Sequence, residues 1–178
     1  LLGVLRQLLA APRGAAGVMP PSLAEAIGAL HRATPKRGLA VVISDFLDGL
    51  AEDGGPTDCP AWEVPLRRLA VRHHVLAVEV TDPRELELPD VGLITLVDPE
   101  SGLRREVSTG SRELRERFAA AAAEQRRQVR DALRRAGAVH LPLRTDRDWV
   151  ADIVRHVHAQ RRLARAARPP AVAGGGLG

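Results

Sequence analysis

The stretch LAVVISDFLD, residues 39–48, decides the fold class. Its first six residues are a continuous aliphatic run of strand length, which is typical of a strand covered on both faces in a parallel sheet. Similar runs occupy residues 75–80 (VLAVEV) and 138–143 (AVHLPL), with helical patterns before, between and after them. Strands that alternate with helices over crossover-length connections predict an α/β fold with a parallel sheet.

Helices are predicted at residues 1–10, 22–31, 62–72, 111–136 and 145–162. Gly137 is expected to end the longest of them. The spacing Thr145-x-x-Asp148 indicates a capping box for the last helix, whose predicted inward face is Trp149, Val150, Ile153, Val154 and Val157. Residues 91–97 and 103–107 flank turn-forming residues and predict a β-hairpin. Residues 1–162 are therefore expected to form one domain, and residues 163–178, rich in Arg, Ala, Pro and Gly, a disordered tail.

Composition excludes several classes of protein. The single cysteine, Cys59, excludes a disulfide framework, and no apolar run is long enough to span a membrane. The chain carries 26 basic and 22 acidic side chains, and the arginines are interleaved with acids in place of forming a basic stripe. Only four aromatic residues occur, two Phe and two Trp, too few for a base-stacking platform. We therefore expect a cytoplasmic protein that does not bind nucleic acid.

Each predicted strand is followed by a hydroxyl residue and an aspartate: Ser44-Asp45, Thr81-Asp82 and Thr145-Asp146. If the strands are parallel, these pairs meet at the carboxyl-end edge, where open α/β sheets bind ligands. The last two pairs begin a loop and a helix, so they are interpreted as turn and cap residues. Asp45 is either a ligand for a hard cation such as Mg²⁺ or an anchor of its own loop.

Other polar residues have structural and functional interpretations. His73 and His74 follow a helix and suit capping or packing. Asp148, Asp152 and His156 recur every four residues, which indicates either a solvated face or a metal-binding stripe. Cys59 lies in a Pro-flanked loop with no designated base, so a free surface thiol is expected in preference to a nucleophile.

Three stretches together resemble one bacterial family: GLAVVISDFLD (38–48), PLRRLAVRHHVLAVEVTDPRELELPDVG (65–92) and RTDRDWVADIV (144–154). The family is the von Willebrand factor A-like domain-of-unknown-function family fifty-eight, and the similarity runs from residue 1 to about residue 162. The resemblance implies a doubly wound, mostly parallel sheet with helices on both faces and an inserted hairpin between Val91 and Val107. It also implies a non-catalytic adaptor that works with a MoxR-type AAA+ ATPase, or its client, in protein or complex maturation.

Family members are believed to hold Mg²⁺ through a D-x-S-x-S loop, a threonine and an aspartate. Only the aspartate carries over, as Asp45; Pro21 stands at the threonine position, and Ser22 would substitute only after a one-residue shift. The first three strands and first helix of that fold would precede Leu1, so we expect part of a longer protein. Strand 39–44 would then present an unpaired edge and an apolar flank. No cofactor is expected, or Mg²⁺ bound weakly and only with the preceding segment.

Two functions of different class follow. The first is a protein-interaction module that binds its partner through the carboxyl-end edge, including loop 49–60. The alternative is a Mg²⁺-dependent hydrolase that uses Asp45 and Asp48 with Asp82 or Asp146.

Overall fold

The computed structural model describes residues 2–10, 21–50, 59–97 and 104–166. Its centre is a parallel sheet of three strands in the order β1 (Leu39–Ser44), β2 (His74–Thr81) and β5 (Val139–Arg144). Leu39 lies opposite His74 in the first pair, and Leu76 lies opposite Val139 in the second. The predicted α/β class with a parallel sheet is therefore confirmed.

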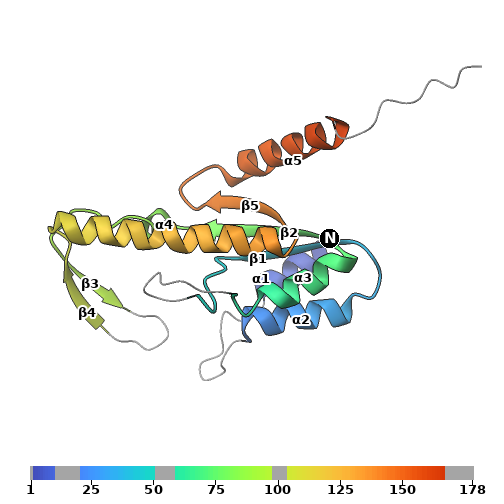
Figure 1. Ribbon diagram of the computed structural model, residues 1–178, viewed down its shortest axis with the longest axis horizontal. Coiled ribbons are helices and arrows are strands. Elements are labelled where there is room, and N and C mark those ends of the chain that lie inside the picture. The colour runs from blue at the N-terminus through green and yellow to red at the C-terminus, as the bar shows by residue number, and fades with distance from the viewer. Residues whose placement is uncertain (1, 11–20, 51–58, 98–103, 167–178) are drawn as a thin grey trace, which may run out of the picture.

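Five helices and one hairpin surround the sheet in the described residues (Figure 1). The helices are α1 (Leu2–Ala10), α2 (Leu23–Ala33), α3 (Glu63–Arg72), α4 (Arg112–Arg135) and α5 (Trp149–Ala166). A short 3₁₀ turn, η1 (Pro83–Glu85), follows β2. The antiparallel hairpin of β3 (Leu93–Val97) and β4 (Arg104–Ser108) confirms the prediction for this segment. Helix α5 continues to Ala166, four residues past its predicted end at residue 162, and the rest of the predicted tail lies outside the described residues.

The main core lies on one face of the sheet, beneath α2, α3 and α4. Ala40 and Val42 of β1 and Val75 and Ala77 of β2 pack there against buried side chains of the helices and the loop after β1: Ile27, Phe46, Trp62, Leu66, Leu69, Val129, Ala132, Leu133 and Ala136. Alternate residues of each strand point to this face, because successive side chains of a strand point in opposite directions.

The opposite face is covered only in part. Val78, Leu141 and Leu143 form a second cluster, against which Ile153 of α5 packs. On β1 the side chains of Leu39, Val41 and Ile43 are 69%, 45% and 67% exposed. The expectation that this strand is covered on both faces is thus wrong for the described residues, while the expected unpaired edge and apolar flank of β1 are confirmed.

Helix α5 differs from its prediction in two respects. It begins at Trp149, and its first turn is capped by Asp148, whose Oδ1 accepts the N–H groups of Val150 (3.0 Å) and Ala151 (3.1 Å). Thr145 is not the cap, because the helix begins four residues later, at Trp149. Of the predicted inward face only Ile153 joins a core cluster, and the other four members are substantially exposed: Trp149, Val150, Val154 and Val157.

Helix α4 ends as its sequence predicts. Gly137 adopts a left-handed φ of 76°, and the Ala138 N–H donates to the carbonyl of Leu133 (3.1 Å), which is the bond pattern of a Schellman motif. Near the start of α4, Arg115 donates to the carbonyl of Thr109 (2.5 Å) and pairs with Asp90 (3.1 Å). These two contacts fix both ends of the hairpin segment to α4.

No described helix is long and apolar enough to cross a membrane.

Candidate functional site

The three hydroxyl–aspartate pairs lie at the carboxyl-end edge of the parallel sheet, as predicted. We call this region the rim and define it as residues 44–48, 81–85 and 144–148. Two of its segments are joined directly, since the Thr145 hydroxyl donates to Asp82 Oδ2 (3.0 Å). Asp82 also accepts the Arg84 N–H at Oδ1 (2.9 Å), and these two bonds hold the pKa of Asp82 below its usual value. Asp82 therefore caps η1 and ties β2 to the loop after β5.

Asp146 has a different partner. Arg144 donates to both of its carboxylate oxygens, Nε to Oδ1 and Nη2 to Oδ2, each at 2.9 Å. This two-bond contact lowers the pKa of Asp146 and raises that of Arg144. The interpretation as turn and cap residues agrees with the contacts of Asp82, which caps η1. It is wrong for Thr145 and Asp146, because α5 begins at Trp149 and Asp148 caps it.

Asp45 anchors its own loop. Its Oδ1 accepts the N–H of Leu47 (3.2 Å) and the hydroxyl of Ser44 (3.3 Å), and the Ser44 Oγ accepts the N–H of Phe46 (3.0 Å). Phe46 has a left-handed φ of 59°, a conformation that costs free energy for a bulky residue. Its ring is fully buried and meets Trp62 edge to face at 5.3 Å, so core packing and the Asp45 turn together hold the loop.

Asp48 and Ser22 each accept a backbone N–H group at the start of α2. Asp48 Oδ2 accepts the Leu23 N–H (2.7 Å), and Ser22 forms a capping box with Glu25. Asp48 Oδ2 and Ser22 Oγ, the further oxygens considered as Mg²⁺ ligands beside Asp45, thus accept backbone N–H groups. Pro21 offers no side-chain oxygen. Among the described residues no group of three or more His, Cys, Asp or Glu side chains is arranged to hold a metal ion. The side-chain oxygens of the described residues therefore do not fit the Mg²⁺ site that the resemblance implies.

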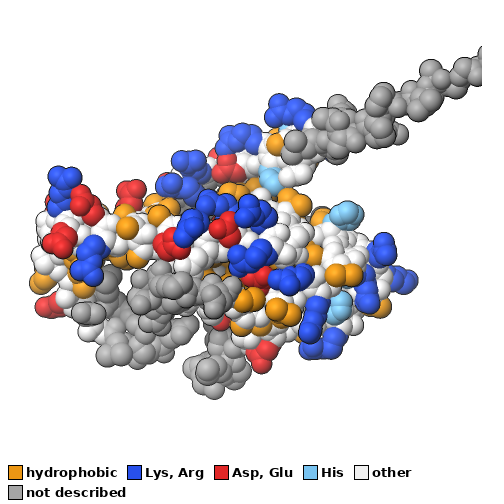
Figure 2. Space-filling view, viewed as in Figure 1, with side chains coloured by type: hydrophobic (Ala, Val, Ile, Leu, Met, Phe, Trp, Pro, Cys, Tyr) orange, Lys and Arg blue, Asp and Glu red, His pale blue; other side chains and the backbone are white. Residues whose placement is uncertain are grey.

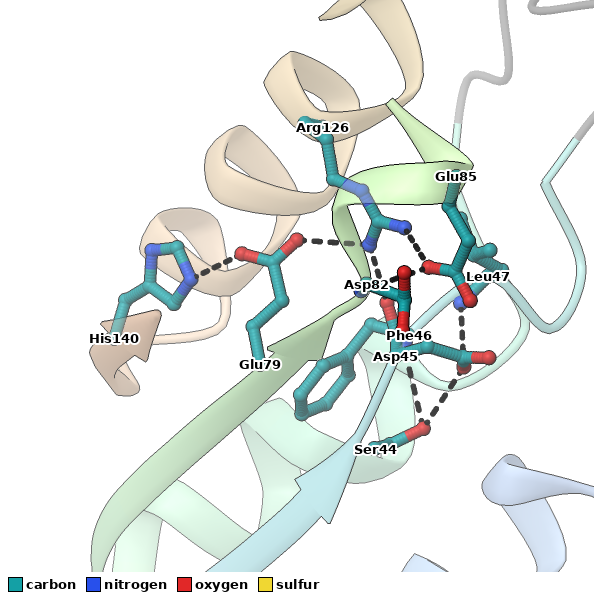
Figure 3. A network of polar contacts seen from close by, with 9 residues as sticks. All are labelled: Ser44, Asp45, Phe46, Leu47, Glu79, Asp82, Glu85, Arg126 and His140. Carbon is teal, nitrogen blue, oxygen red and sulfur yellow. Dashed lines mark hydrogen bonds and ion pairs between the residues drawn. The ribbon is translucent and has the colours of Figure 1, made fainter. Parts of the chain in front are cut away.

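A charged network, which the sequence analysis did not identify, lies behind the rim (Figure 3). Arg126 of α4 donates from Nη1 to the backbone carbonyl of Asp45 and to Glu79 Oε1, both at 3.0 Å, and from Nη2 to Glu85 Oε2 at 3.3 Å. The other oxygen of Glu79 lies 2.6 Å from His140 Nε2. One guanidinium therefore connects α4 with the loop after β1, with β2 and with η1.

A signal for this network was present in the sequence. Glu79 is a carboxylate in the middle of the aliphatic strand VLAVEV, and its side chain is only 5% exposed. A buried carboxylate requires charged or hydrogen-bonding partners, so its position alone predicts a cation nearby. The identity of that cation depends on the rotation of a helix about 50 residues further along the chain, which periodicity alone does not determine.

The remaining candidates are placed away from the rim network. His73 is buried and its Nε2 lies 3.1 Å from the Thr34 carbonyl, in agreement with a packing role. Cys59 is a free, exposed cysteine, as expected; desolvation of the thiol and the neighbouring Glu63 raise its pKa. The Asp148, Asp152 and His156 stripe forms no metal cluster in the described part of the chain, since Asp148 caps α5 and Asp152 pairs with Arg155.

Comparison with protein families gives one match. The family described as "Protein of unknown function DUF58" matches residues 1–128, which is more than two thirds of the chain.

The chain is also similar to curated mycobacterial proteins. An uncharacterised protein of Mycobacterium avium is 48% identical over 165 residues, which cover 93% of this chain and 90% of that protein. Uncharacterised proteins of Mycobacterium tuberculosis and Mycobacterium bovis are 51% identical over 163 residues, covering 92% of this chain and 48% of theirs. The chain thus spans about half the length of these two relatives, and no solved structure matches it.

Proposed function

The chain belongs to the DUF58 family, and we propose that it is a non-catalytic protein-interaction module that binds its partner at the rim. The observation that carries this proposal is the construction of the loop at residues 44–48. Its side-chain and backbone groups are fixed from three directions: by Asp45, by the buried ring of Phe46 and by Arg126. A preorganised loop at the exposed end of a rigid sheet is a common way to present a binding surface.

We further propose that the fold is of the von Willebrand A type. Three features of the described residues support it: the parallel sheet, helices on both of its faces, and a hairpin inserted after β2. The partner proposed from the resemblance is a MoxR-type AAA+ ATPase or its client. A cytoplasmic location fits such a partner and the single free cysteine.

The contacts favour loop support over hydrolysis as the role of the rim carboxylates. Asp45 and Asp48 each accept a backbone N–H, from Leu47 and Leu23 respectively, and Asp82 and Asp146 each have partners of their own. The hydrolase alternative would be restored by Mg²⁺-dependent turnover of a generic phosphate ester that Asp45→Asn abolishes.

The proposal is tested by measuring the equilibrium affinity between this protein and a purified MoxR-type AAA+ ATPase. Asp45→Ala removes the acceptor that holds the turn and is expected to weaken binding by about tenfold. The matched control is Asp131→Ala, which removes an equal charge from an exposed pair with Arg134 on α4. If a folded Asp45→Ala variant binds as tightly as the control, the rim is not the contact surface.

A further inference from the structure

A pocket of about 310 Å³ opens between α4 and the neighbouring strands β2 and β5, on the α4 side of the sheet. Arg126 and Arg130 of α4 and Arg144 of β5 contribute cationic groups, whereas the lining has one carboxylate, that of Glu79. The remaining lining residues are Thr81, Leu86, His140, Pro142 and Leu143. Two carboxylates outside the lining, Glu85 and Asp146, also pair with Arg126 and Arg144. In the described residues the unmatched cationic charge of the lining is therefore that of Arg130.

The one carboxylate in the lining is already neutralised. Both oxygens of Glu79 are occupied, Oε1 by Arg126 (3.0 Å) and Oε2 by His140 Nε2 (2.6 Å), and its side chain is almost fully buried. Glu79 therefore offers no free oxygen to a bound cation. The second ring nitrogen of His140, Nδ1, points away from Glu79 (Figure 3).

Arg130 is the group in the lining without a counter-ion. It lies four residues after Arg126, on the same side of α4, and is exposed. Among the described residues it has no hydrogen bond and no ion pair, although Arg126, Arg127, Arg134 and Arg135 of the same helix each have a carboxylate partner. A guanidinium beside a partly apolar pocket is a ready donor pair for a carboxylate or a phosphate.

The surroundings favour an anionic group carried by a protein. Leu86, Pro142 and Leu143 give the pocket apolar walls that suit the methylene stem of a glutamate or aspartate. Arginine side chains, interspersed with carboxylates, gather over the C-terminal half of α4 and along α5 (Figure 2), which favours approach of an acidic surface. The pocket also adjoins the rim, because Thr81 and Arg144 belong to both and Arg126 donates to the Asp45 carbonyl.

We propose that this pocket binds a carboxylate side chain of the protein partner, with Arg130 as the primary contact and Arg144 as a second donor. The inference rests on the proposed function, since it names the chemistry of that partner's contact. Arg144 lines the pocket and is 36% exposed; its Nε and Nη2 groups donate to Asp146, so Nη1 is the group it offers. A free phosphate could use the same donors, and the test separates the two sources.

The test is a titration of the ¹⁵N-labelled protein, followed by NMR, with three probes. The first is a capped hexapeptide of alternating glutamate and glycine, the second is the same peptide with glutamine in place of glutamate, and the third is inorganic phosphate. The glutamate peptide is expected to give saturable shifts at the amides of α4 and β5 around Arg130 and His140, and the glutamine peptide none. Arg130→Gln should weaken that binding about tenfold, as expected for one charge-assisted contact.

The matched control is Arg134→Gln, which removes the same charge one turn further along α4, outside the pocket lining. It is expected to change the affinity less than about twofold. Equal losses in the two variants, or no saturable shifts with the glutamate peptide, would overturn the proposal. Shifts with phosphate alone would assign the pocket to a free anion and also overturn it.

This result is independent of the test of the rim. Loss of the ATPase complex in Asp45→Ala with unaltered peptide binding would support both proposals. Peptide binding that depends on Arg130, in a protein that Asp45→Ala leaves fully competent for the ATPase, would contradict the rim proposal alone.

Discussion

Replacement of Arg126 by leucine tests whether the network behind the rim holds the structure together. Arg126 is only 16% exposed and is the cation paired with the buried Glu79. Removal of one member of a buried ion pair typically costs about 3–5 kcal/mol, because the remaining charge is left without compensation. His140 stays beside Glu79, so the lower end applies, and the half-exposed Glu85 contact adds under about 1 kcal/mol. We expect the free energy of unfolding to fall by about 3 kcal/mol.

The measurement is urea denaturation at neutral pH, followed by circular dichroism. The control is Arg127→Leu at the next residue, whose exposed pair with Glu124 should be worth less than about 1 kcal/mol. A second variant separates charge from packing: Glu79→Val combined with Arg126→Leu removes both charges and leaves an aliphatic strand. Because the cost arises from the uncompensated carboxylate, this double variant should be at least about 1 kcal/mol more stable than Arg126→Leu alone.

Two results would refute this reasoning. If Arg126→Leu costs no more than Arg127→Leu, the guanidinium contributes little to stability and its contacts are incidental. If the double variant is less stable than either single variant, the loss comes from packing and not from an unpaired Glu79. Either result would also remove the argument that Arg126 fixes the loop at residues 44–48.

Three further predictions concern other parts of the chain. The pKa values of Asp82, Asp146 and Glu63 in the folded protein are lowered from their ordinary values of 3.8, 3.8 and 4.5. Their contribution to stability is therefore present above those unfolded values and is lost as the pH falls through the lower folded values. Urea midpoints measured between neutral pH and pH 2 should show this loss, with a shallower decline in Asp82→Asn. The pKa of the Cys59 thiol is raised from 9.0, so at pH 7 it should react with a disulfide reagent more slowly than free cysteine does. Glu63→Gln should increase the reaction rate of Cys59, and a wild-type rate equal to that of free cysteine would contradict the prediction. Ile43→Lys replaces a side chain that is 67% exposed on β1, so it should change the unfolding free energy by less than about 0.5 kcal/mol. It should also reduce any concentration-dependent association seen by sedimentation velocity, because a charge on an edge strand opposes pairing. A large destabilisation would show that the exposed face is covered in solution.

Sequence patterns predicted most of the fold because its elements are defined locally. The aliphatic run of β1 gave bounds that agree with the structure, and Gly137 correctly marked the end of α4. The predicted start of α5 was wrong because two residues, Thr145 and Asp148, are both of types that commonly cap helices. In the structure the Asp148 carboxylate accepts the first N–H groups of the helix, whereas the Thr145 hydroxyl donates to Asp82, 63 residues away. Residue type alone does not reveal which of the two is the cap.

The candidate site was predicted only in its outline. Parallel strands place their following residues at one edge, so the grouping of the aspartates there could be predicted. The partners of each carboxylate could not, because they come from other elements: Leu23 of α2 for Asp48, and Arg126 of α4 for Glu79 and the Asp45 carbonyl. Such contacts depend on the distance and rotation of packed helices, which are tertiary properties.

Among the residues that the structure describes, the Asp45 turn of the rim and Arg130 of the pocket have no contact in common, so the functions proposed for them can be separated by experiment. The Asp45 side chain holds its turn through Ser44 and Leu47, whereas its backbone carbonyl is held by Arg126. Asp45→Ala therefore loosens the turn and leaves the Glu79 network in place, and Arg130→Gln removes a cation that supports nothing else in the described residues. Arg126→Leu alters both regions, since Arg126 contacts the rim loop and also lines the pocket. A partner that contacts both regions should therefore lose more affinity with Arg126→Leu than with either of the other two substitutions, whereas one that contacts the rim alone should respond to Asp45→Ala and Arg126→Leu but not to Arg130→Gln.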